Sequence, residues 1–369
     1  MRTSNKTFLS ILFILSLSCR QREISLDQFI NTEIENGKAP GIGLSIIIKG
    51  DILVSKGYGY ADIENRIPFT DSTIMNIASI SKTFIGVSVM HAIEKGLLNL
   101  EDDVNKFLSF KIVNPHRPDK VIKVKHLLGH RSSIIDEDKT YKASYFYGGD
   151  APISLGNFLE KYLSKNGAYY SEHNFLDKDP GTIESYSNIG AGLAAHILEN
   201  IMKKPFNLIT KDLIFRPLGM KNTVWFLSEM ENQSSHAKLY KNEKNKNKLI
   251  DVDLYGLITY PDGGLRTNVK DLTKYLHFIM CDMPVQDIIN KESKENMLTP
   301  DFDQTYAKFW DTKDLIGHGG WDPGVTSSMY FDPKNEIGII LFTNTSTYAN
   351  FYALQKKTYK HALRLRDSN

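Results

Sequence analysis

The stretch Ile77-Ala78-Ser79-Ile80-Ser81-Lys82-Thr83 opens a segment of helical character that continues to Gly96. In a helix, the spacing S-x-x-K places Ser79 and Lys82 on one face, one turn apart, and directs Ser81 elsewhere. A serine hydroxyl becomes a good nucleophile when a base accepts its proton, and lysine can do so when burial and nearby positive charge lower its pKa. The helix N-terminus adds positive potential and N–H groups for an oxyanion. The stretch predicts a nucleophilic serine, although four-residue matches of common residue types also arise by chance.

A second polar pattern, Y-x-N, lies in residues 180–188, directly before a helix that we expect to begin at Ile189. We predict that Tyr186 is buried beside Lys82 and carries protons, and that Asn188 holds the lysine and contacts the substrate amide. The alternative is that Tyr186 packs in the core and Asn188 caps the helix, because asparagine is a good N-cap.

A third element is the glycine-rich stretch Gly317-His318-Gly319-Gly320-Trp321-Asp322-Pro323-Gly324. Glycines allow close approach of the backbone, so a strand edge here can lie along a substrate and offer an N–H to an oxyanion. Taken alone, such a stretch is more often a turn.

Both ends of the chain predict a hairpin and a helix. The N-terminal end has a helical pattern from Leu26 to Ile34, followed by a hairpin of residues 43–48 and 52–57. The C-terminal end has a hairpin of residues 327–331 and 337–343, followed by a helix over residues 354–365. We expect the two hairpins to share one antiparallel sheet.

The middle of the chain predicts helices, over residues 83–96, 155–164, 189–202, 205–215 and 269–280. The run Lys241–Lys248 is polar and of low complexity, which is typical of a surface loop. The fold class is therefore α/β: an antiparallel sheet built from N- and C-terminal hairpins and flanked by helices, plus a helix-rich lobe. We expect an active site between the sheet and the lobe.

Composition excludes several classes of function. The 45 basic and 43 acidic residues are scattered along the chain, so no cationic face for nucleic acid is expected. His126 and His130 have the i, i+4 spacing of a zinc pair, but Leu127 stands where H-E-x-x-H has glutamate. We therefore expect no metal and no other cofactor.

The first nineteen residues predict an export signal. Two basic residues precede an apolar run, Phe8 to Leu17, that is too short to span a bilayer. The run ends at Cys19 in a sequence that resembles the lipobox of bacterial lipoproteins, with Ser16 in place of the usual branched aliphatic residue. We expect a signal peptide over residues 1–19, a periplasmic or cell-surface protein anchored to the membrane by lipid on Cys19, and a mature domain over residues 24–366. Secretion without an anchor is the alternative.

The order S-x-x-K, Y-x-N, H-G-G resembles the serine β-lactamase and penicillin-binding-protein superfamily, in particular its class C-like branch of β-lactamase-related serine hydrolases. The resemblance covers nearly the whole chain after the leader. It is supported by further segments at residues 57–62, 102–108, 124–130, 217–220 and 263–265. The fold that it implies is the β-lactamase/DD-peptidase-like fold.

Carried over position by position, the resemblance makes Ser79 the acylated nucleophile and Lys82 its base. Tyr186 becomes the acid/base partner and Asn188 a substrate contact.

The same comparison makes His318, Gly319 and Gly320 the substrate-binding strand, with His318 in place of the lysine of the K-T-G motif. The oxyanion donors implied are the backbone N–H groups of Ser79 and Trp321. Because H-G-G lacks both the lysine and the hydroxyl that seat a β-lactam carboxylate, we expect inefficient β-lactam turnover. We expect His318 to be fractionally charged at neutral pH, and the Trp321 side chain to form an apolar wall of the pocket.

The function predicted is hydrolysis of an ester, a D-amino-acid amide or a peptide through an acyl-enzyme, with a small-molecule or peptide acyl compound as substrate. The alternatives are a penicillin-binding type DD-peptidase or β-lactamase at the cell wall, and a non-catalytic wall-binding lipoprotein. The oligomeric state stays open.

Overall fold

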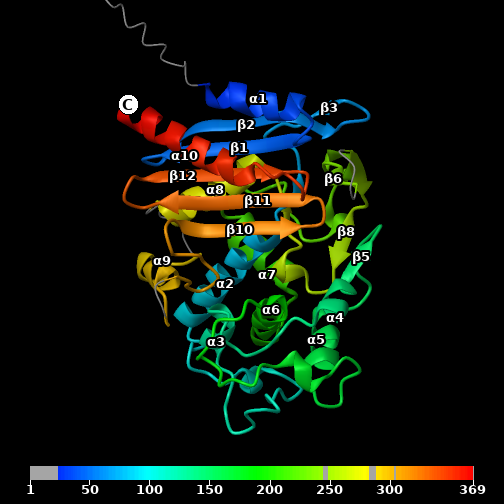
Figure 1. The fold of residues 1–369 in the computed structure, drawn as a ribbon. Coiled ribbons are helices and arrows are strands. Elements are labelled where there is room, and N and C mark those ends of the chain that lie inside the picture. Colours follow the sequence, from blue (N-terminus) through cyan, green and yellow to red (C-terminus); the bar gives the residue numbers. More distant parts are fainter. Residues whose placement is uncertain (1–23, 244–247, 282–287, 303–304, 369) are drawn as a thin grey trace, which may run out of the picture.

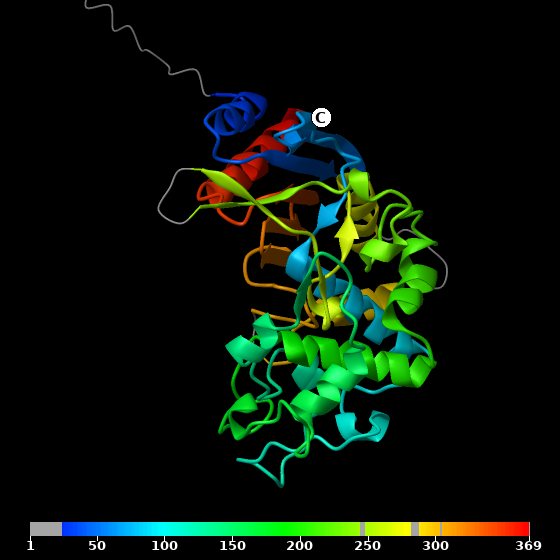
Figure 2. The ribbon, with the colours of Figure 1, turned by 90° about the vertical axis from the view of Figure 1, so that its right-hand side faces the viewer.

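The protein is described by a computed structural model. The structure describes residues 24–243, 248–281, 288–302 and 305–368, so the predicted signal peptide and Cys19 lie outside the described residues. The chain forms a sheet layer and a helix-rich lobe, as predicted (Figure 1). Figure 2 shows both parts from the side, with the sheet layer above the lobe.

The sheet layer is a six-stranded antiparallel sheet of order β10-β11-β12-β1-β2-β3. β1 pairs with β12 along seven residues, so the N- and C-terminal hairpins share one sheet as predicted. β10 lies at one edge, which leaves one side of its backbone without a neighbouring strand of this sheet. The strands are β1 (Gly41–Ile48), β2 (Asp51–Asp62), β3 (Ile67–Pro68), β10 (Ile316–Asp322), β11 (Val325–Asp332) and β12 (Ile337–Thr343).

Helices cover both faces of this sheet. α1 (Leu26–Glu35) and α10 (Phe351–Ser368) pack on one face, where Leu44 and Ile46 belong to their apolar core. α8 (Val269–Met280) packs on the other face, close against Gly43. Because both faces are covered, all eight residues of β1 are buried, which explains its nearly continuous apolar sequence.

The lobe is built around α2, whose residues are buried on all sides. α6 packs against α2, α3 and α5. The helices of this part are α2 (Lys82–Glu94), α3 (Val124–Leu128), α4 (Asp138–Lys142), α5 (Leu155–Leu163), α6 (Asn188–Met202), α7 (Phe206–Thr210) and α9 (Lys291–Leu298). The helix expected over residues 205–215 is divided, because α7 continues as a π-helical turn, Lys211–Phe215.

Within the described residues, three two-stranded ribbons accompany the main sheet. They are β4 (Met75–Asn76) with β9 (Arg266–Thr267), β5 (Tyr145–Tyr147) with β8 (Tyr255–Leu257), and β6 (Leu239–Asn242) with β7 (Leu249–Val252). The expectation of a loop over Lys241–Lys248 is partly wrong, because Lys241 and Asn242 pair with β7, while residues 244–247 lie outside the described residues. Among the helices that the structure describes, none combines the length and apolar character needed to cross a bilayer.

Candidate active site

Ser79 lies on a 3₁₀ turn, η1 (Ala78–Ser81), which leads directly into α2. The preceding residue, Ala78, has φ 48°, a left-handed conformation that is uncommon for alanine. Ser81 holds this turn, because its hydroxyl donates to Ala78 O at 2.6 Å and accepts from the Leu265 N–H at 3.2 Å. Ser81 is therefore structural, and Ser79 is partly exposed.

Lys82 is fully buried and contacts three oxygen atoms. Its Nζ lies 3.1 Å from Ser79 Oγ, 2.7 Å from Asn188 Oδ1 and 2.7 Å from the carbonyl oxygen of Asp262. A neutral lysine has two N–H bonds and one lone pair. If Asn188 and Asp262 accept the two N–H bonds, the lone pair points toward Ser79, which is the geometry required of its base.

Tyr186 and Asn188 reach the site from the N-terminus of α6. Ser187 is the N-cap of this helix, so the alternative that Asn188 serves as the cap is wrong, and its side chain binds Lys82 instead. The centre of the Tyr186 ring lies 4.9 Å from Lys82 Nζ. The prediction that Tyr186 is buried is wrong, because the side chain lies at the open side of the site and is 44% exposed.

The edge strand β10 directs the Trp321 N–H out of the sheet. Gly317 exchanges both backbone hydrogen bonds with Asp311, on the side away from β11. Backbone groups alternate along a strand, so the N–H groups of Gly319 and Trp321 point to the same free edge. A Cβ on Gly320 would lie 2.6 Å from Ile77 O, so glycine is needed where β10 approaches the nucleophile turn.

His318 is buried and both of its ring nitrogens have partners in the protein. Nδ1 lies 2.5 Å from Gly319 O and Nε2 lies 3.1 Å from the Tyr306 hydroxyl. A neutral ring satisfies both contacts, with Nδ1–H donating and Nε2 accepting. Burial, with a smaller contribution from the charge of Lys82, lowers the pKa of His318 to about 4. The expectation that His318 is fractionally charged at neutral pH is therefore wrong.

The Trp321 side chain does not form a wall of the site. Side chains alternate along β10, so His318 and Asp322 face inward while Trp321 faces the opposite side. The indole is 68% exposed and its Nε1–H donates to Ser346 O at 2.9 Å. The expected apolar wall is wrong, and only the backbone of Trp321 is placed to meet a substrate.

Residues 26–363 match the Beta-lactamase protein family. The chain belongs to this family. The family and the observed fold together support a hydrolase, and they confirm the resemblance and the fold class inferred from the sequence.

Three proteins illustrate what this β-lactamase-family chain is similar to. Protein flp of Staphylococcus aureus is 24% identical over 328 residues, which are 87% of this chain and 63% of that protein. The chain thus spans less than two thirds of that relative. The octameric penicillin-binding protein homologue from Pyrococcus abyssi is 28% identical, with a TM-score of 0.73 over 92% of this chain and 76% of that chain. D-amino acid amidase from Ochrobactrum anthropi is 20% identical and has the same fold, with a TM-score of 0.72 over 93% of this chain and 97% of that chain.

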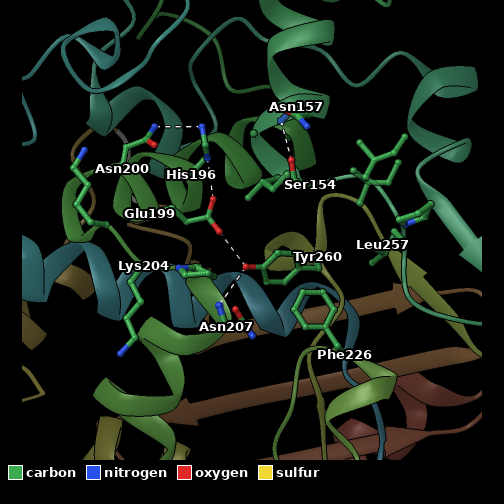
Figure 3. A pocket seen from close by; sticks show the side chains of 18 residues that line it. Ser154, Asn157, His196, Glu199, Asn200, Lys204, Asn207, Phe226, Leu257 and Tyr260 are labelled. Carbon is green, nitrogen blue, oxygen red and sulfur yellow. Dashed lines mark hydrogen bonds and ion pairs between the residues drawn. The ribbon is translucent and has the colours of Figure 1, made fainter.

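Behind Lys82, the carbonyl group of Asp262 is held by its own short turn, η7 (Tyr260–Asp262). Figure 3 shows the Tyr260 side chain pointing from this turn toward Glu199 of α6, and its hydroxyl lies 3.2 Å from both Glu199 Oε1 and the Asn207 N–H. These residues line a cavity of about 680 Å³. The contacts fix the turn that supplies one of the three oxygens around Lys82.

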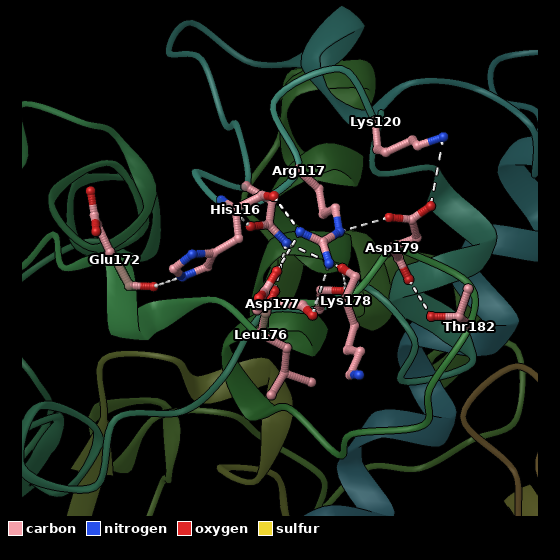
Figure 4. Close-up of polar contacts among 11 residues, drawn as sticks. His116, Arg117, Lys120, Glu172, Leu176, Asp177, Lys178, Asp179 and Thr182 are labelled. Atoms are coloured by element: carbon pink, nitrogen blue, oxygen red, sulfur yellow. Dashed lines mark hydrogen bonds and ion pairs between the residues drawn. The ribbon is translucent and has the colours of Figure 1, made fainter.

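The loop that leads to Tyr186 is tied to a second loop of the lobe (Figure 4). Arg117 forms ion pairs with Asp177 and Asp179. The buried amide of Asn114 donates to Leu176 O at 2.9 Å. This network is structural. It restrains the loop that leads to Tyr186 and Asn188.

Four residues of the site were not found from the sequence. The Asp136 carboxylate binds the N-terminus of α6. The His130 Nδ1 accepts from the Ser187 N–H at 3.2 Å, and the His130 ring lies tilted against the Tyr186 ring with 4.1 Å between the ring centres. Asp262 and Asp322 are two buried carboxyl groups beside Lys82, which contributes to the pKa of each. Asp322 stands four residues after His318, so strand periodicity would have placed it on the same inward face. No local spacing marks Asp136 or Asp262.

Proposed function

We propose that this protein is a serine hydrolase that forms an acyl-enzyme on Ser79 and releases the acyl group to water. Its substrate would be an ester, a D-amino-acid amide or a peptide. The observation that carries the proposal is the 3.1 Å contact between Lys82 Nζ and Ser79 Oγ, with the other two contacts of the lysine taken by Asn188 and Asp262.

Acylation would begin when Lys82 accepts the Ser79 proton and the serine oxygen attacks the substrate carbonyl carbon. The carbonyl oxygen gains negative charge, which the N–H groups of Ser79 and Trp321 stabilise. The bond to the leaving group then breaks, and the leaving group takes a proton.

Tyr186 is placed to deliver that proton, because its ring lies over Lys82 on the open side of the site. It would regain the proton from Lys82. In deacylation, a water molecule would attack the acyl carbon and give its proton to Lys82 and Tyr186. The bond to the Ser79 oxygen then breaks, and Ser79 regains its proton. The Asn188 oxygen is held by Lys82, so its NH₂ group is available to a substrate carbonyl.

The site does not favour β-lactams. A β-lactam carries a carboxylate, and the protein offers it a neutral His318 whose ring nitrogens are both occupied. Gly319 provides no hydroxyl, and the buried carboxyl groups of Asp262 and Asp322 would repel an anion when ionised.

The proposal is tested with p-nitrophenyl esters, D-amino-acid p-nitroanilides and a chromogenic cephalosporin, using wild type and Ser79→Ala. We expect wild type to hydrolyse an ester or an anilide, and Ser79→Ala to lose at least ~10³-fold in kcat/KM. Ser72→Ala is the matched control, because that hydroxyl is exposed and binds Asp71 and Lys270. A stable penicillin adduct seen by intact mass would favour the DD-peptidase alternative, and rapid cephalosporin turnover would favour a β-lactamase. No reaction with any substrate would favour the non-catalytic alternative.

We further propose that the protein is exported and anchored by lipid on Cys19, with the domain held close to a membrane surface. The support is the basic residues, short apolar run and lipobox-like sequence of residues 1–19. Metabolic labelling with an alkyne fatty acid should mark wild type and not Cys19→Ser, and equal labelling of both would contradict the anchor.

A further inference from the structure

Two buried carboxyl groups, those of Asp262 and Asp322, lie close to the nucleophile and have no part in the acyl transfer proposed above. Asp262 is 1% exposed and Asp322 is 5% exposed. A Cβ placed on Gly263 would lie 3.5 Å from Asp322 Oδ2 and 3.8 Å from the carbonyl carbon of Ala78. Only the width of one methyl group therefore separates this carboxyl group from the peptide bond that carries the Ser79 N–H.

Tyrosine side chains surround the two carboxyl groups. The Tyr141 hydroxyl donates to Asp262 Oδ1 at 3.0 Å, and the Tyr145 hydroxyl donates to Asp322 Oδ1. The rings of Tyr145 and Tyr255 lie 5.3 Å apart. Tyr147 packs beside Tyr255 at 5.6 Å and is about half exposed, so it forms the outer side of the cluster. Carboxylates combined with aromatic faces are the chemistry that recognises organic cations.

Several buried polar atoms in this region have no hydrogen-bond partner. They include Asp262 Oδ2 and the hydroxyl oxygens of Thr259 and Ser144, all on residues no more than 1% exposed. The Thr259 hydroxyl lies near enough to Asp262 to lower its pKa, but the two groups do not meet in hydrogen-bond geometry. Buried polar groups are usually satisfied, so Asp262 Oδ2 can accept a hydrogen bond from a polar group that enters the site.

The charge of that ligand follows from the reaction. Negative charge on Asp262 and Asp322 would oppose the oxyanion that forms at the Ser79 N–H, because the groups are close and shielded from water. A positive charge bound between the carboxyl groups and the tyrosines would remove this penalty and supply hydrogens to the unpaired oxygen atoms.

We propose that Asp262, Asp322 and the surrounding tyrosines form a subsite for a primary ammonium group on the acyl part of the substrate. The inference rests on the proposed acyl transfer at Ser79, and it narrows the substrate class to acyl compounds with an amine near the carbonyl group. The ammonium group would donate to the carboxylates and lie against the tyrosine rings.

The protonation of Asp262 and Asp322 makes the preference for an ammonium-bearing substrate depend on pH. Burial is the largest cause that raises the pKa of both Asp262 and Asp322 to about 7. The negative charge of Asp262 raises the pKa of Asp322 further, and that of Asp136 raises the pKa of Asp262. An ammonium ion binds best to the ionised pair, so its advantage grows as the pH rises through about 7. The titratable and charged groups that face the pair are Lys82, Asp136, Tyr141, Tyr145, Tyr147, Tyr255 and Arg266.

The test compares β-alanyl p-nitroanilide with butyryl p-nitroanilide, which replaces the ammonium group by a methyl group. The ammonium stays protonated from about pH 6 to about pH 8. The ratio of the two kcat/KM values cancels any pH dependence of the acyl-transfer steps that both substrates share. We expect a ratio above ~10 at about pH 8 that falls toward ~1 at about pH 6.

Asp322→Asn should lower this ratio about tenfold at about pH 8, and Asp262→Asn should do the same. Asp51→Asn, at the exposed first residue of β2, is the matched control and should leave the ratio unchanged. A ratio near ~1 at every pH, with both substrates hydrolysed, would overturn the subsite and leave the proposed hydrolase standing.

A binding measurement on wild type tests the subsite even if the variants do not fold or the anilides are not hydrolysed. Propylammonium should slow the labelling of Ser79 by a fluorophosphonate more than 1-propanol does, and more strongly at about pH 8 than at about pH 6. Equal protection by the amine and the alcohol would overturn the subsite. A wild-type protein that is never labelled would instead overturn the proposed function, and the subsite with it.

Discussion

At the residue scale, Asp136 shows how one side chain can fix the start of α6, where Asn188 lies. Its carboxylate accepts from the Asn188 N–H at 2.7 Å, from the Ile189 N–H at 3.0 Å and from the Ser187 hydroxyl at 2.8 Å. A carboxylate at a helix N-terminus is also favoured by the helix dipole. This places the Asn188 side chain against Lys82.

We expect Asp136→Asn to destabilise the protein by about 2 kcal/mol, because an amide NH₂ would face backbone N–H donors that a charged acceptor satisfied. The measurement is the free energy of unfolding from urea denaturation. Asp138→Asn is the control, because its ion pair with Lys142 is exposed, and it should cost less than about 0.5 kcal/mol. Equal stability of the two variants would show that Asp136 does not anchor α6.

Residues in short local patterns were predictable. Ser79 and Lys82 are one turn apart, and Tyr186 and Asn188 are two residues apart at the start of α6, so sequence spacing alone brings each pair together. The state of His318 was not predictable, because its low pKa follows from burial against the distant Tyr306 and Lys82. The role of Asp136 likewise depends on contacts with residues that are more than fifty positions away in the sequence.

At the scale of elements, the close packing of β10 on the nucleophile turn decides the shape of the site. The approach depends on Gly320, whose Cα faces Ile77 O, whereas Gly319 faces the opposite side of the strand. The two glycines therefore form a matched pair on one strand.

We expect Gly320→Ala to destabilise the protein by about 1–3 kcal/mol, because the new methyl group must push β10 away from η1. Gly319→Ala should be neutral or slightly stabilising, because its Cβ would meet the Tyr330 hydroxyl at an ordinary 3.5 Å. Thermal or urea unfolding of both variants measures the difference. Similar losses for the two would show that the contact with Ile77 does not limit this position.

Elements with strong periodicity were predicted nearly to their ends, including α8 and the C-terminal hairpin of the main sheet. The N-terminal hairpin was predicted less completely, because β2 continues past residue 57 to Asp62. The ribbon β5–β8 was not predicted, because its strands are three residues long and more than a hundred positions apart. The π-helical turn after α7 was also missed, since its sequence has the same periodicity as a regular helix.

At the scale of the whole molecule, the site lies where the sheet layer meets the lobe. β10 supplies His318 from the sheet, α6 supplies Asn188 from the lobe, and α2 with Lys82 passes between them. Catalysis would therefore require both parts to be folded. The buried titratable groups are distributed over both parts, so their protonation affects the stability of the entire chain.

We expect the stability of the folded protein to be highest near about pH 7. Burial lowers the pKa values of His126, His130, His236 and His318, so the unfolded chain binds more protons than the folded chain at these sites, and stability falls as the pH drops below the unfolded value of about 6.5. Burial raises the pKa values of Asp262 and Asp322, so their contribution to stability is full below the unfolded value of about 3.9 and is lost as the pH rises from there through about 7.

Urea midpoints measured from about pH 5 to about pH 8.5 test this pH dependence. Asp322→Asn should move the maximum to higher pH, because asparagine does not ionise. A wild-type midpoint that rises steadily to the highest pH would contradict the raised pKa values of the acidic pair.

The central claim is that Ser79 is the nucleophile and Lys82 its base. Its most direct test is tandem mass spectrometry of the protein after reaction with a fluorophosphonate, which locates the adduct on one residue. The account predicts a single adduct on Ser79 in wild type and in the control Ser72→Ala, and none in Ser79→Ala or in a folded Lys82→Ala. An adduct on any other residue, or undiminished labelling of Lys82→Ala, would contradict it.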